Sequence, residues 1–335
     1  MVTKVAIIGG GAVAHAHIPI VTESPDSEVA VVVDKDVERA RELADANGIE
    51  HAVGDWNEAA SLADAAIIAL PHHLHAPAAI ELLEKGLHVL VEKPMGMTLA
   101  ECDAMIDVAQ AKKRVLAVGL VSRWFGIAAY VKDILNSGLI GRVESFDVRE
   151  GMIYSWPVAS DFMFRKETGG GVLADTGAHV LDLVLYWLGD CADLEYEHDA
   201  EGGVEADCTL RMTMESGARG VVEMSRTRDL RNTWILRGEK GTLEVMRRFA
   251  AEWTWSVEGR GTVLSGTVQT DGKPEDPLEC FRAQWTDFLG AIREGREPFL
   301  NGVEGRRGVE LIERCHAVAK PFAGESARPW EVFNQ

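Results

Sequence analysis

The sequence predicts an α/β protein in which a parallel, doubly wound sheet is followed by an α+β domain with an open, mostly antiparallel sheet. Three observations predict this fold class. Short apolar runs alternate with helical stretches over the first third of the chain. A glycine-rich turn at residues 9–14 follows the first apolar run directly. Beyond about residue 120, apolar and polar residues alternate and turn residues become more frequent.

The apolar runs of the first third predict buried parallel strands. They are rich in Val, Ile and Ala without a regular two-residue alternation, as expected when helices cover both faces of a sheet. These strands are predicted at residues 5–8, 29–33, 66–69, 89–91 and 115–118. Helical stretches at residues 37–47, 76–85 and 99–112 lie between them, and strands separated by helices form parallel sheets.

The second part of the chain predicts antiparallel strands with helices beside them. The alternating segments span residues 142–149, 206–214, 220–225 and 234–237, and the helical ones span residues 173–187, 279–294 and 305–319. Residues 267–277 contain Gly272, Pro274 and Pro277 and form the predicted flexible connection. We therefore expect a cofactor-binding domain over residues 1–121 and a substrate-binding and oligomerisation domain over residues 122–335.

Composition excludes several classes of function. The chain has 335 residues and a formal net charge of -19, which argues against a nucleic-acid partner and against docking on an anionic membrane. No run of about 18 to 20 apolar residues is present to span a bilayer, and the first apolar run is too short for a signal peptide. The expected location is cytoplasmic.

No metal site or disulfide framework is expected. The five cysteines, at positions 102, 191, 208, 280 and 315, are scattered and form no C-x-x-C pair. His72, His73 and His75 are too close in sequence to converge easily on one ion, and no nearby carboxylate or cysteine completes a ligand set.

The glycine-rich turn has the pattern of a dinucleotide site. Gly9, Gly11 and Ala14 fit G-x-G-x-x-G/A, with Ala12 and Val13 between the last two. The first small residue permits the tight turn, the second lets the backbone approach a pyrophosphate, and the third lets the helix pack closely on the strand. The phosphates then meet unpaired N–H groups at the start of a helix.

An acidic residue follows at the expected distance. Asp34 lies twenty residues after Ala14, at the end of the second predicted strand, where a carboxylate binds the ribose hydroxyls of NAD. Because Asp34 would repel a 2′-phosphate, NAD is favoured over NADP. The neighbouring cations Lys35 and Arg39 leave NADP as a less favoured alternative.

Two further segments carry groups suited to proton transfer. One is Glu92-Lys93-Pro94, directly after the strand at residues 89–91. In the other, a helix starting near Leu173 would place Asp175, His179 and Asp182 on one face. Oxidation of an alcohol needs a base for the hydroxyl proton, and an imidazole titrates in the useful range.

In these motifs and their order the sequence resembles the glucose-fructose oxidoreductase / inositol dehydrogenase family (Gfo/Idh/MocA). The matching pieces run over nearly the whole chain: Gly9 to Ala14, Pro71 with His75, Gly86 to Pro94, Ser137 to Gly141, Gly169 to Asp182, Gly238 to Thr242 and Ala291 to Pro298. The resemblance implies an N-terminal Rossmann domain, a C-terminal α+β domain with a large open sheet, and a homodimer or homotetramer built on that sheet.

The resemblance also implies roles for particular residues. Lys93 corresponds to the family's active-site lysine, which touches the nicotinamide ribose and the reacting hydroxyl, and Asp175 and His179 correspond to its substrate-side pair. We expect His179 to act as general base or acid, Lys93 as polariser and proton partner, and Asp175 to orient the hydroxyl or the imidazole. The lysine and histidine roles could be exchanged. By resemblance, Pro71, His75 and Glu92 join the glycine turn, Asp34, Lys35 and Lys93 around the cofactor, and the Lys93-Pro94 bond is expected to be cis.

Substrate-binding candidates lie at the start of the second part and before the glycines at residues 169–171. Arg123 and Trp124 stand where the family lines its cleft, and Trp156 and Arg165 could face the same cleft. An arginine there could bind a carboxylate or phosphate through two hydrogen bonds, and a tryptophan could stack on a sugar. Trp156 is equally compatible with the edge of a core strand, and Arg123 and Arg165 are also compatible with structural ion pairs.

Three functions are compatible with this set of residues. The first is an NAD-dependent dehydrogenase or reductase that acts on a secondary alcohol or ketone of a sugar, polyol or sugar derivative. The second retains NAD and uses transient sugar oxidation for elimination or glycoside cleavage. The third is a non-catalytic NAD-binding sensor, which would not need Lys93, Asp175 and His179 together.

Overall fold

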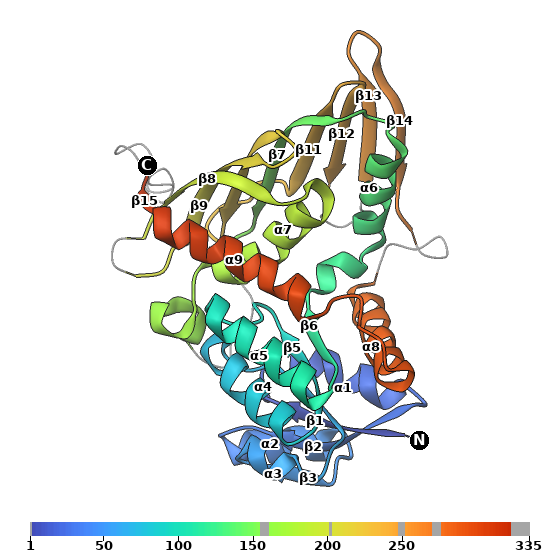
Figure 1. Ribbon diagram of the computed structural model, residues 1–335, viewed down its shortest axis with the longest axis vertical. Coiled ribbons are helices and arrows are strands. Elements are labelled where there is room, and N and C mark those ends of the chain that lie inside the picture. Colours follow the sequence, from blue (N-terminus) through green and yellow to red (C-terminus); the bar gives the residue numbers. More distant parts are fainter. Residues whose placement is uncertain (1, 155–160, 201–202, 247–251, 270–275, 323–335) are drawn as a thin grey trace.

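The computed structural model describes residues 2–154, 161–200, 203–246, 252–269 and 276–322. Within these residues the chain forms a six-stranded sheet and a nine-stranded sheet, which Figure 1 shows in the lower and upper halves of the molecule. The predicted α/β fold class is confirmed, and the second sheet is mixed but mostly antiparallel.

The first sheet is parallel, with the strand order β3-β2-β1-β4-β5-β6. Its strands are β1 (Thr3–Ile8), β2 (Ser27–Val33), β3 (His51–Val53), β4 (Ala65–Ile68), β5 (His88–Glu92) and β6 (Leu116–Gly119). Strands β2 and β3 lie on one side of β1, whereas β4, β5 and β6 lie on the other side. Ligands of such sheets bind at the carboxyl ends of the strands beside this switch in strand order. The glycine turn follows β1 at this position.

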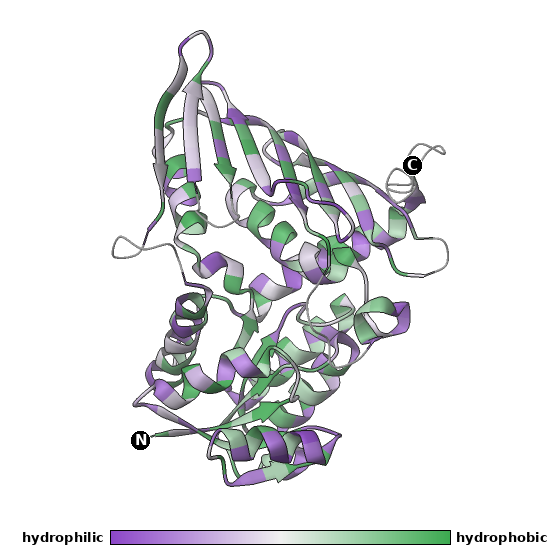
Figure 2. Ribbon diagram, turned by 180° about the vertical axis from the view of Figure 1, so that it is seen from behind, coloured by the Kyte–Doolittle hydropathy of each residue, from purple (hydrophilic) through white to green (hydrophobic). Residues whose placement is uncertain are grey.

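Helices join these strands. They are α1 (Ala14–Glu23), α2 (Val37–Ala46), α3 (Trp56–Ala59), α4 (His75–Glu84) and α5 (Leu99–Lys112). The Asp36 side chain accepts the Arg39 N–H at the start of α2, and the Thr98 side chain accepts the Glu101 N–H at the start of α5. The apolar runs of β1, β4, β5 and β6 are buried, as predicted, and appear green in Figure 2.

The second sheet has the order β14-β13-β12-β11-β7-β10-β9-β8-β15. Its strands are β7 (Val143–Gly151), β8 (Cys191–His198), β9 (Asp207–Met214), β10 (Arg219–Ser225), β11 (Thr233–Gly238), β12 (Gly241–Met246), β13 (Glu252–Val257), β14 (Gly261–Thr267) and β15 (Lys320–Pro321). In β9, Cys208, Leu210 and Met212 are buried while Thr209 and Arg211 between them are not. The buried face packs against α6 (Gly126–Ser137), α7 (Val172–Leu188) and α9 (Gly302–Val318).

One late helix returns to the first sheet. This helix, α8 (Pro277–Glu294), buries Trp285, Phe288 and Leu289 in a cluster that also contains Val5 and Ile7 of β1. The Trp285 Nε1–H donates to Ser27 Oγ at 3.0 Å, at the start of β2. The chain therefore crosses between the two sheets more than once (Figure 1).

The cysteines belong to the buried core of the protein. All five cysteine residues are buried. Burial raises the pKa of the Cys102 thiol to about 12 and that of the Cys208 thiol well above its usual value. Among the helices in the described ranges, none combines the length and the apolar character that crossing a membrane requires.

Candidate active site

The first position of the glycine turn after β1 can be filled only by glycine. Gly9 has φ +105°, and a Cβ there would lie 2.4 Å from the carbonyl oxygen of Ala69. A Cβ at Gly11, in contrast, would meet no described atom within 4 Å. The first glycine is thus required by close packing, whereas the second leaves open space beside the backbone, as an approaching pyrophosphate needs.

The start of α1 fits a phosphate group. Within the described residues no side chain caps this end, and its first turn contains no acidic residue. The N–H groups of Ala14, His15 and Ala16 donate to backbone carbonyls of the turn itself. The positive dipole end of the helix is therefore what favours an anion at this position. Ala14 is fully buried, which agrees with the close packing of helix on strand that this position needs. These features fit the pyrophosphate of a dinucleotide.

Asp34 lies beside the same turn. It is 8% exposed, and its Oδ2 accepts the Gly10 N–H at 2.9 Å while its Oδ1 accepts the Asp36 N–H at 2.9 Å. Arg39 Nη1 lies 3.5 Å from Oδ2. The carboxylate is thus fixed at the end of β2, beside the residue that precedes Gly11. Lys35 is exposed next to it.

Lys93 follows directly after β5, and the neighbouring Glu92 is held in the core. Glu92 Oε1 lies 2.8 Å from His17 Nε2 of α1, and Glu92 Oε2 accepts the Lys93 N–H at 3.3 Å. Burial raises the pKa of Glu92, but His17 and Lys93 outweigh it, so the net effect on the pKa is downward. The carboxylate fits because Gly119 has no side chain, whose Cβ would lie 2.7 Å from Oε2. The Lys93-Pro94 peptide bond is cis, as expected.

The Lys93 side chain crosses from the first sheet to α7. Its Nζ donates to Asp175 Oδ1 at 2.6 Å and to the Asp175 carbonyl at 3.2 Å. Arg226, just after β10, donates to Asp175 Oδ2 at 2.8 Å and to the Met163 carbonyl at 3.2 Å. Burial raises the pKa of Asp175, but the two cations hold it well below its usual range. Asp175 is thus a carboxylate paired with both a lysine and an arginine.

His179 lies one turn further along α7. The helix begins at Val172, close to the predicted Leu173, so Asp175 and His179 lie on one face. His179 is half-buried. An ammonium held by Asp175 therefore lies within one helical turn of an imidazole.

Three successive glycines hold the start of α7. A Cβ at Gly169 would lie 2.9 Å from the His72 Cβ, one at Gly170 2.5 Å from the Met163 carbonyl oxygen, and one at Gly171 2.3 Å from Glu205 Oε1. Glu205 Oε1 also accepts the Leu173 N–H at 2.9 Å. Burial raises the pKa of this carboxyl. The glycine run thus brings three close neighbours to the helix end that carries Asp175.

The histidines after β4 occupy the same region. His75 is fully buried, with Nδ1 2.8 Å from the Pro94 carbonyl and Nε2 2.8 Å from the Leu70 carbonyl. It therefore connects the segment beside Pro71 with the segment that carries Lys93. His72 Nδ1 donates to the Gly169 carbonyl at 2.7 Å, which links the first half of the chain to the start of α7.

The predicted substrate residues are dispersed. Arg123 is 5% exposed and pairs with Asp182, Trp124 packs edge-on against Phe299, and Arg165 is exposed and pairs with Asp161. Trp156 lies outside the described residues. Two members of the predicted catalytic set, Lys93 and Asp175, contact each other directly.

Sequence reasoning missed three residues that hold this arrangement: His17, Glu205 and Arg226. His17 stands on the buried side of α1, three residues after Ala14, which is a usable signal for contact with the next strand end. Glu205 and Arg226 come from loops far along the chain. Only the fold brings these two to α7.

Comparison with known proteins gives two matches to family models. A model described as "Oxidoreductase family, NAD-binding Rossmann fold" matches residues 3–120, and one described as "GFO/IDH/MocA C-terminal domain" matches residues 128–244. Together they span the glycine turn, Asp34, Lys93, Asp175 and His179.

Individual relatives match over almost the whole chain. Levoglucosan dehydrogenase of Pseudarthrobacter phenanthrenivorans is 30% identical over 96% of this chain and 97% of its own. A 4-carboxy-2-hydroxymuconate-6-semialdehyde dehydrogenase of Sphingobium is 25% identical over 88% and 92%. A solved structure of levoglucosan dehydrogenase in complex with NADH and L-sorbose is 25% identical, covers 95% of this chain and 97% of its own, and has a TM-score of 0.83.

Proposed function

This chain belongs to the GFO/IDH/MocA oxidoreductase family, and from that membership we propose that it transfers a hydride between NAD and a secondary alcohol or ketone carbon of a sugar, polyol or sugar derivative. The substrate class is supported by the levoglucosan dehydrogenase relative and by its complex with L-sorbose. The Sphingobium relative acts, by its name, on a different compound, so the experiment below tests the class directly.

The single observation that carries the chemistry is the contact of 2.6 Å between Lys93 Nζ and Asp175 Oδ1. It brings a cation from the carboxyl end of β5 to the helix that carries His179. The glycine turn follows β1 at the same edge of the sheet, separated from β5 by β4 alone. A substrate carbon above that edge would lie between the cofactor site and these groups.

Each residue of the site has its own role in the transfer of the hydride and the proton. The bound nicotinamide supplies the hydride acceptor or donor. Lys93, held as a cation against the ionised Asp175, donates a hydrogen bond to the reacting oxygen and polarises it. His179 takes the hydroxyl proton in the oxidation direction and returns it in the reduction direction. Arg226 keeps Asp175 ionised, and Glu92 holds the backbone N–H of Lys93.

NAD is the dinucleotide that the turn fits best. Asp34 presents a fixed carboxylate where the adenosine ribose would lie, and a carboxylate there accepts from ribose hydroxyls and repels a 2′-phosphate. Arg39, at 3.5 Å, offsets part of this repulsion. NADP is therefore the weaker of the two cofactors.

We also propose a cytoplasmic homodimer or homotetramer built on the outer face of the nine-stranded sheet. Five buried thiols suit a reducing compartment. On the face opposite α7, Val221 and Ile235 are only partly buried among polar residues. Light scattering coupled to gel filtration would give the number of copies, and a monomer would contradict the assembly.

The test is a panel of polyols, aldoses, anhydrosugars and nucleotide sugars incubated with NAD⁺ while NADH absorbance is followed. We expect turnover with at least one member, lost in the variant Lys93→Met while calorimetry still detects NAD⁺ binding. Silence across the panel from protein that binds NAD⁺ would contradict the proposed substrate class.

A further inference from the structure

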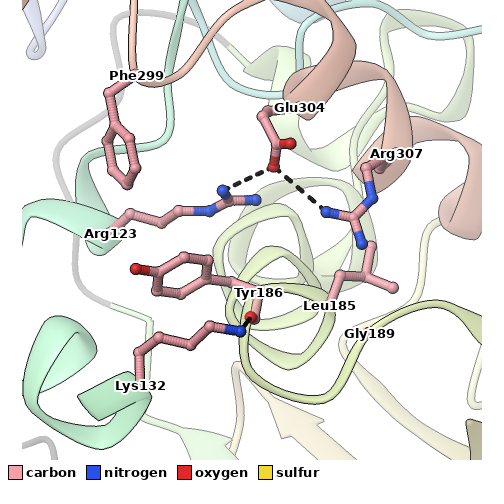
Figure 3. Close-up of a pocket in the computed structure, with 8 residues that line it drawn as sticks. All are labelled: Arg123, Lys132, Leu185, Tyr186, Gly189, Phe299, Glu304 and Arg307. Atoms are coloured by element: carbon pink, nitrogen blue, oxygen red, sulfur yellow. Dashed lines mark hydrogen bonds and ion pairs between the residues drawn. The ribbon is translucent and has the colours of Figure 1, made fainter. Parts of the chain in front are cut away.

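A second hollow lies away from the glycine turn. Its volume is about 370 Å³, and its lining includes Arg123, Lys132, Tyr186, Phe299, Glu304 and Arg307 (Figure 3). The lining comes from the segment before α6, from α6, from the end of α7 and from the start of α9. Neither Lys93, Asp175 nor His179 lines it. It is therefore a separate feature of the fold.

Two arginines of the hollow are held by carboxylates. Arg123 pairs with Asp182 at 2.6 Å and with Glu304 at 2.7 Å. Arg307 pairs with Asp190 at 2.7 Å and with Glu304 at 3.3 Å. Figure 3 shows Glu304 between the two guanidinium groups. Both cations are thus fixed in direction, which lowers the entropy that a ligand would lose on binding them.

Lys132 differs from the two arginines. Its Nζ donates to the Tyr186 carbonyl at 2.6 Å and lies 5.1 Å from the centre of the Tyr186 ring. Over the described part of the chain, none of the ion pairs involves its ammonium, which retains further N–H donors. Burial and the positive charges of Arg123 and Arg307 lower the pKa of Lys132.

Aromatic rings complete the hollow. The Tyr186 ring lies between the side chains of Arg123 and Lys132 in Figure 3, and the Arg123 guanidinium carbon is 4.7 Å from the ring centre. Phe299 packs edge-on against Tyr186, with 6.4 Å between the ring centres. The hollow therefore offers cationic donors next to an apolar wall.

We propose that this hollow binds a small anion through a carboxylate or phosphate group, held by Lys132 and Arg307 with the rest of the molecule against Tyr186 and Phe299. Carboxylate and phosphate share the oxygen acceptors that ammonium and guanidinium donors recognise. An anion there would be the negatively charged partner that the Lys132 ammonium lacks among the described ion pairs. Glu304 stays on the opposite side, between the arginines.

The hollow and the predicted catalytic residues Asp175 and His179 share helix α7. Tyr186 lies on α7 eleven residues after Asp175, about 16 Å along the helix axis. Asp182, between them on the same helix, is the buried partner of Arg123. An anion in the hollow would therefore lie against the end of α7 opposite to the end that carries Asp175.

The test measures anion binding to protein saturated with NAD⁺, so that the pyrophosphate site at the glycine turn is filled. The probes are inorganic phosphate and malonate, compared with sodium chloride at equal ionic strength. We expect a saturable rise in the thermal unfolding midpoint and a matching heat of binding. Loss of one charge-assisted hydrogen bond weakens affinity by roughly tenfold or more, which is the change expected for Lys132→Met.

Controls separate a specific site from general charge effects. Lys112→Met removes the same charge from an exposed helix position and should leave the affinity unchanged, whereas Lys132→Arg should restore it. Arg307→Gln, at the rim, gives an independent test should Lys132→Met fail to fold. A response to only one probe supports the site and identifies its anionic group. The absence of a saturable response in the unmodified protein, or an equal response in Lys132→Met and Arg307→Gln, overturns the proposal.

Discussion

Asp175 connects two cations that come from opposite halves of the chain. Lys93 approaches from β5 and Arg226 from the end of β10, at 2.6 Å and 2.8 Å. A buried carboxylate with one cation removed would carry a large desolvation cost. The position of the Lys93 ammonium therefore depends on a residue that does not touch it.

For Lys93→Met we expect kcat to fall by roughly 10² to 10⁴, because the polarising hydrogen bond and its charge disappear. NAD⁺ affinity should stay close to that of the unmodified protein, since methionine keeps much of the side-chain volume. Stopped-flow measurement of NADH formation with the best substrate of the panel tests this. Lys85→Met, on an exposed helix end, is the control, and an equal loss there would contradict the assignment.

For Arg226→Met we expect the pKa of Asp175 to rise, because one of the two cations that lower it is removed while burial remains. As the solution is made more acidic, activity should therefore be lost at a higher pH than in the unmodified protein. A kcat–pH profile measures this change. Arg226→Lys should restore part of the profile, and an unchanged acid limb in Arg226→Met would count against a positioning role.

For Asp34→Asn we expect the ratio of kcat/KM for NADP⁺ to that for NAD⁺ to rise roughly tenfold or more, the equivalent of about 1.4 kcal/mol. The substitution removes the charge that repels a 2′-phosphate and leaves Arg39 at 3.5 Å available to it. Asp36→Asn is the matched control, because Asp36 also pairs with Arg39. An equal rise in both variants would show that the effect is not specific to the ribose site.

How far the sequence predicts these residues depends on distance along the chain. Asp34 and the glycines lie within one βαβ unit, where spacing alone positions them. Lys93 and Asp175 are 82 residues apart, so family resemblance rather than spacing predicts that they meet. Arg226 follows an ordinary strand, and no local pattern distinguishes it from the exposed Arg211 on β9.

Among the elements, α7 is the one whose placement the site depends on most. Three groups lie close to the three glycines at its start: His72, the Met163 carbonyl and Glu205. At Gly189, after its other end, a Cβ would meet no described atom within 4 Å. The helix is thus anchored at the end that carries Asp175.

For Gly171→Ala we expect a loss of several kcal/mol of stability, visible as a lower thermal unfolding midpoint, together with a lower kcat. Its φ is +112°, and the new Cβ would lie 2.3 Å from Glu205 Oε1. Gly189→Ala, at φ +86° on the same helix, is the matched control, with backbone strain of roughly 1–3 kcal/mol but no clash. Equal losses in the two variants would mean that the contact with Glu205 contributes nothing.

The elements differ in how well sequence predicts them. The pattern predicts helix α5 at its observed bounds, because Thr98 caps one end and Lys113 adopts a left-handed conformation at the other. It does not reveal strand β3, since three half-buried residues at a sheet edge carry no clear pattern. Strand β14 also escapes prediction, because it is mostly exposed and shows no alternation of buried and exposed residues. Strand β13 alternates polar and apolar residues from Glu252 to Val257, so its pattern is a usable signal that the sequence reasoning missed.

In the whole molecule, His72 connects the two sheets through a single hydrogen bond to Gly169. Burial lowers the pKa of His72 to about 3, with further lowering from His75 and Lys93. The unfolded chain takes up a proton near pH 6.5, whereas the folded protein does not until near pH 3. This residue therefore makes the protein lose stability as the pH falls from about 6.5 to 3.

For His72→Asn we expect a flatter dependence of the unfolding midpoint on pH between about 6.5 and 4. Asparagine can still donate to the Gly169 carbonyl but does not titrate. Scanning calorimetry at several pH values measures the slope, to which one group contributes up to about 1.36 kcal/mol for each pH step of one. His15→Asn, at an exposed position, is the control. An unchanged slope in His72→Asn would mean that other groups account for the acid sensitivity.

The buried cysteines allow local opening of the fold to be detected by chemical labelling. An alkylating reagent attacks the thiolate, so a raised thiol pKa and burial together protect these side chains while the fold is intact. Cys102 lies in the core of the first sheet, whereas Cys191, Cys208 and Cys315 lie in the core of the second. Mass spectrometry of the labelled peptides after brief exposure to iodoacetamide would therefore tell which half of the protein opens first.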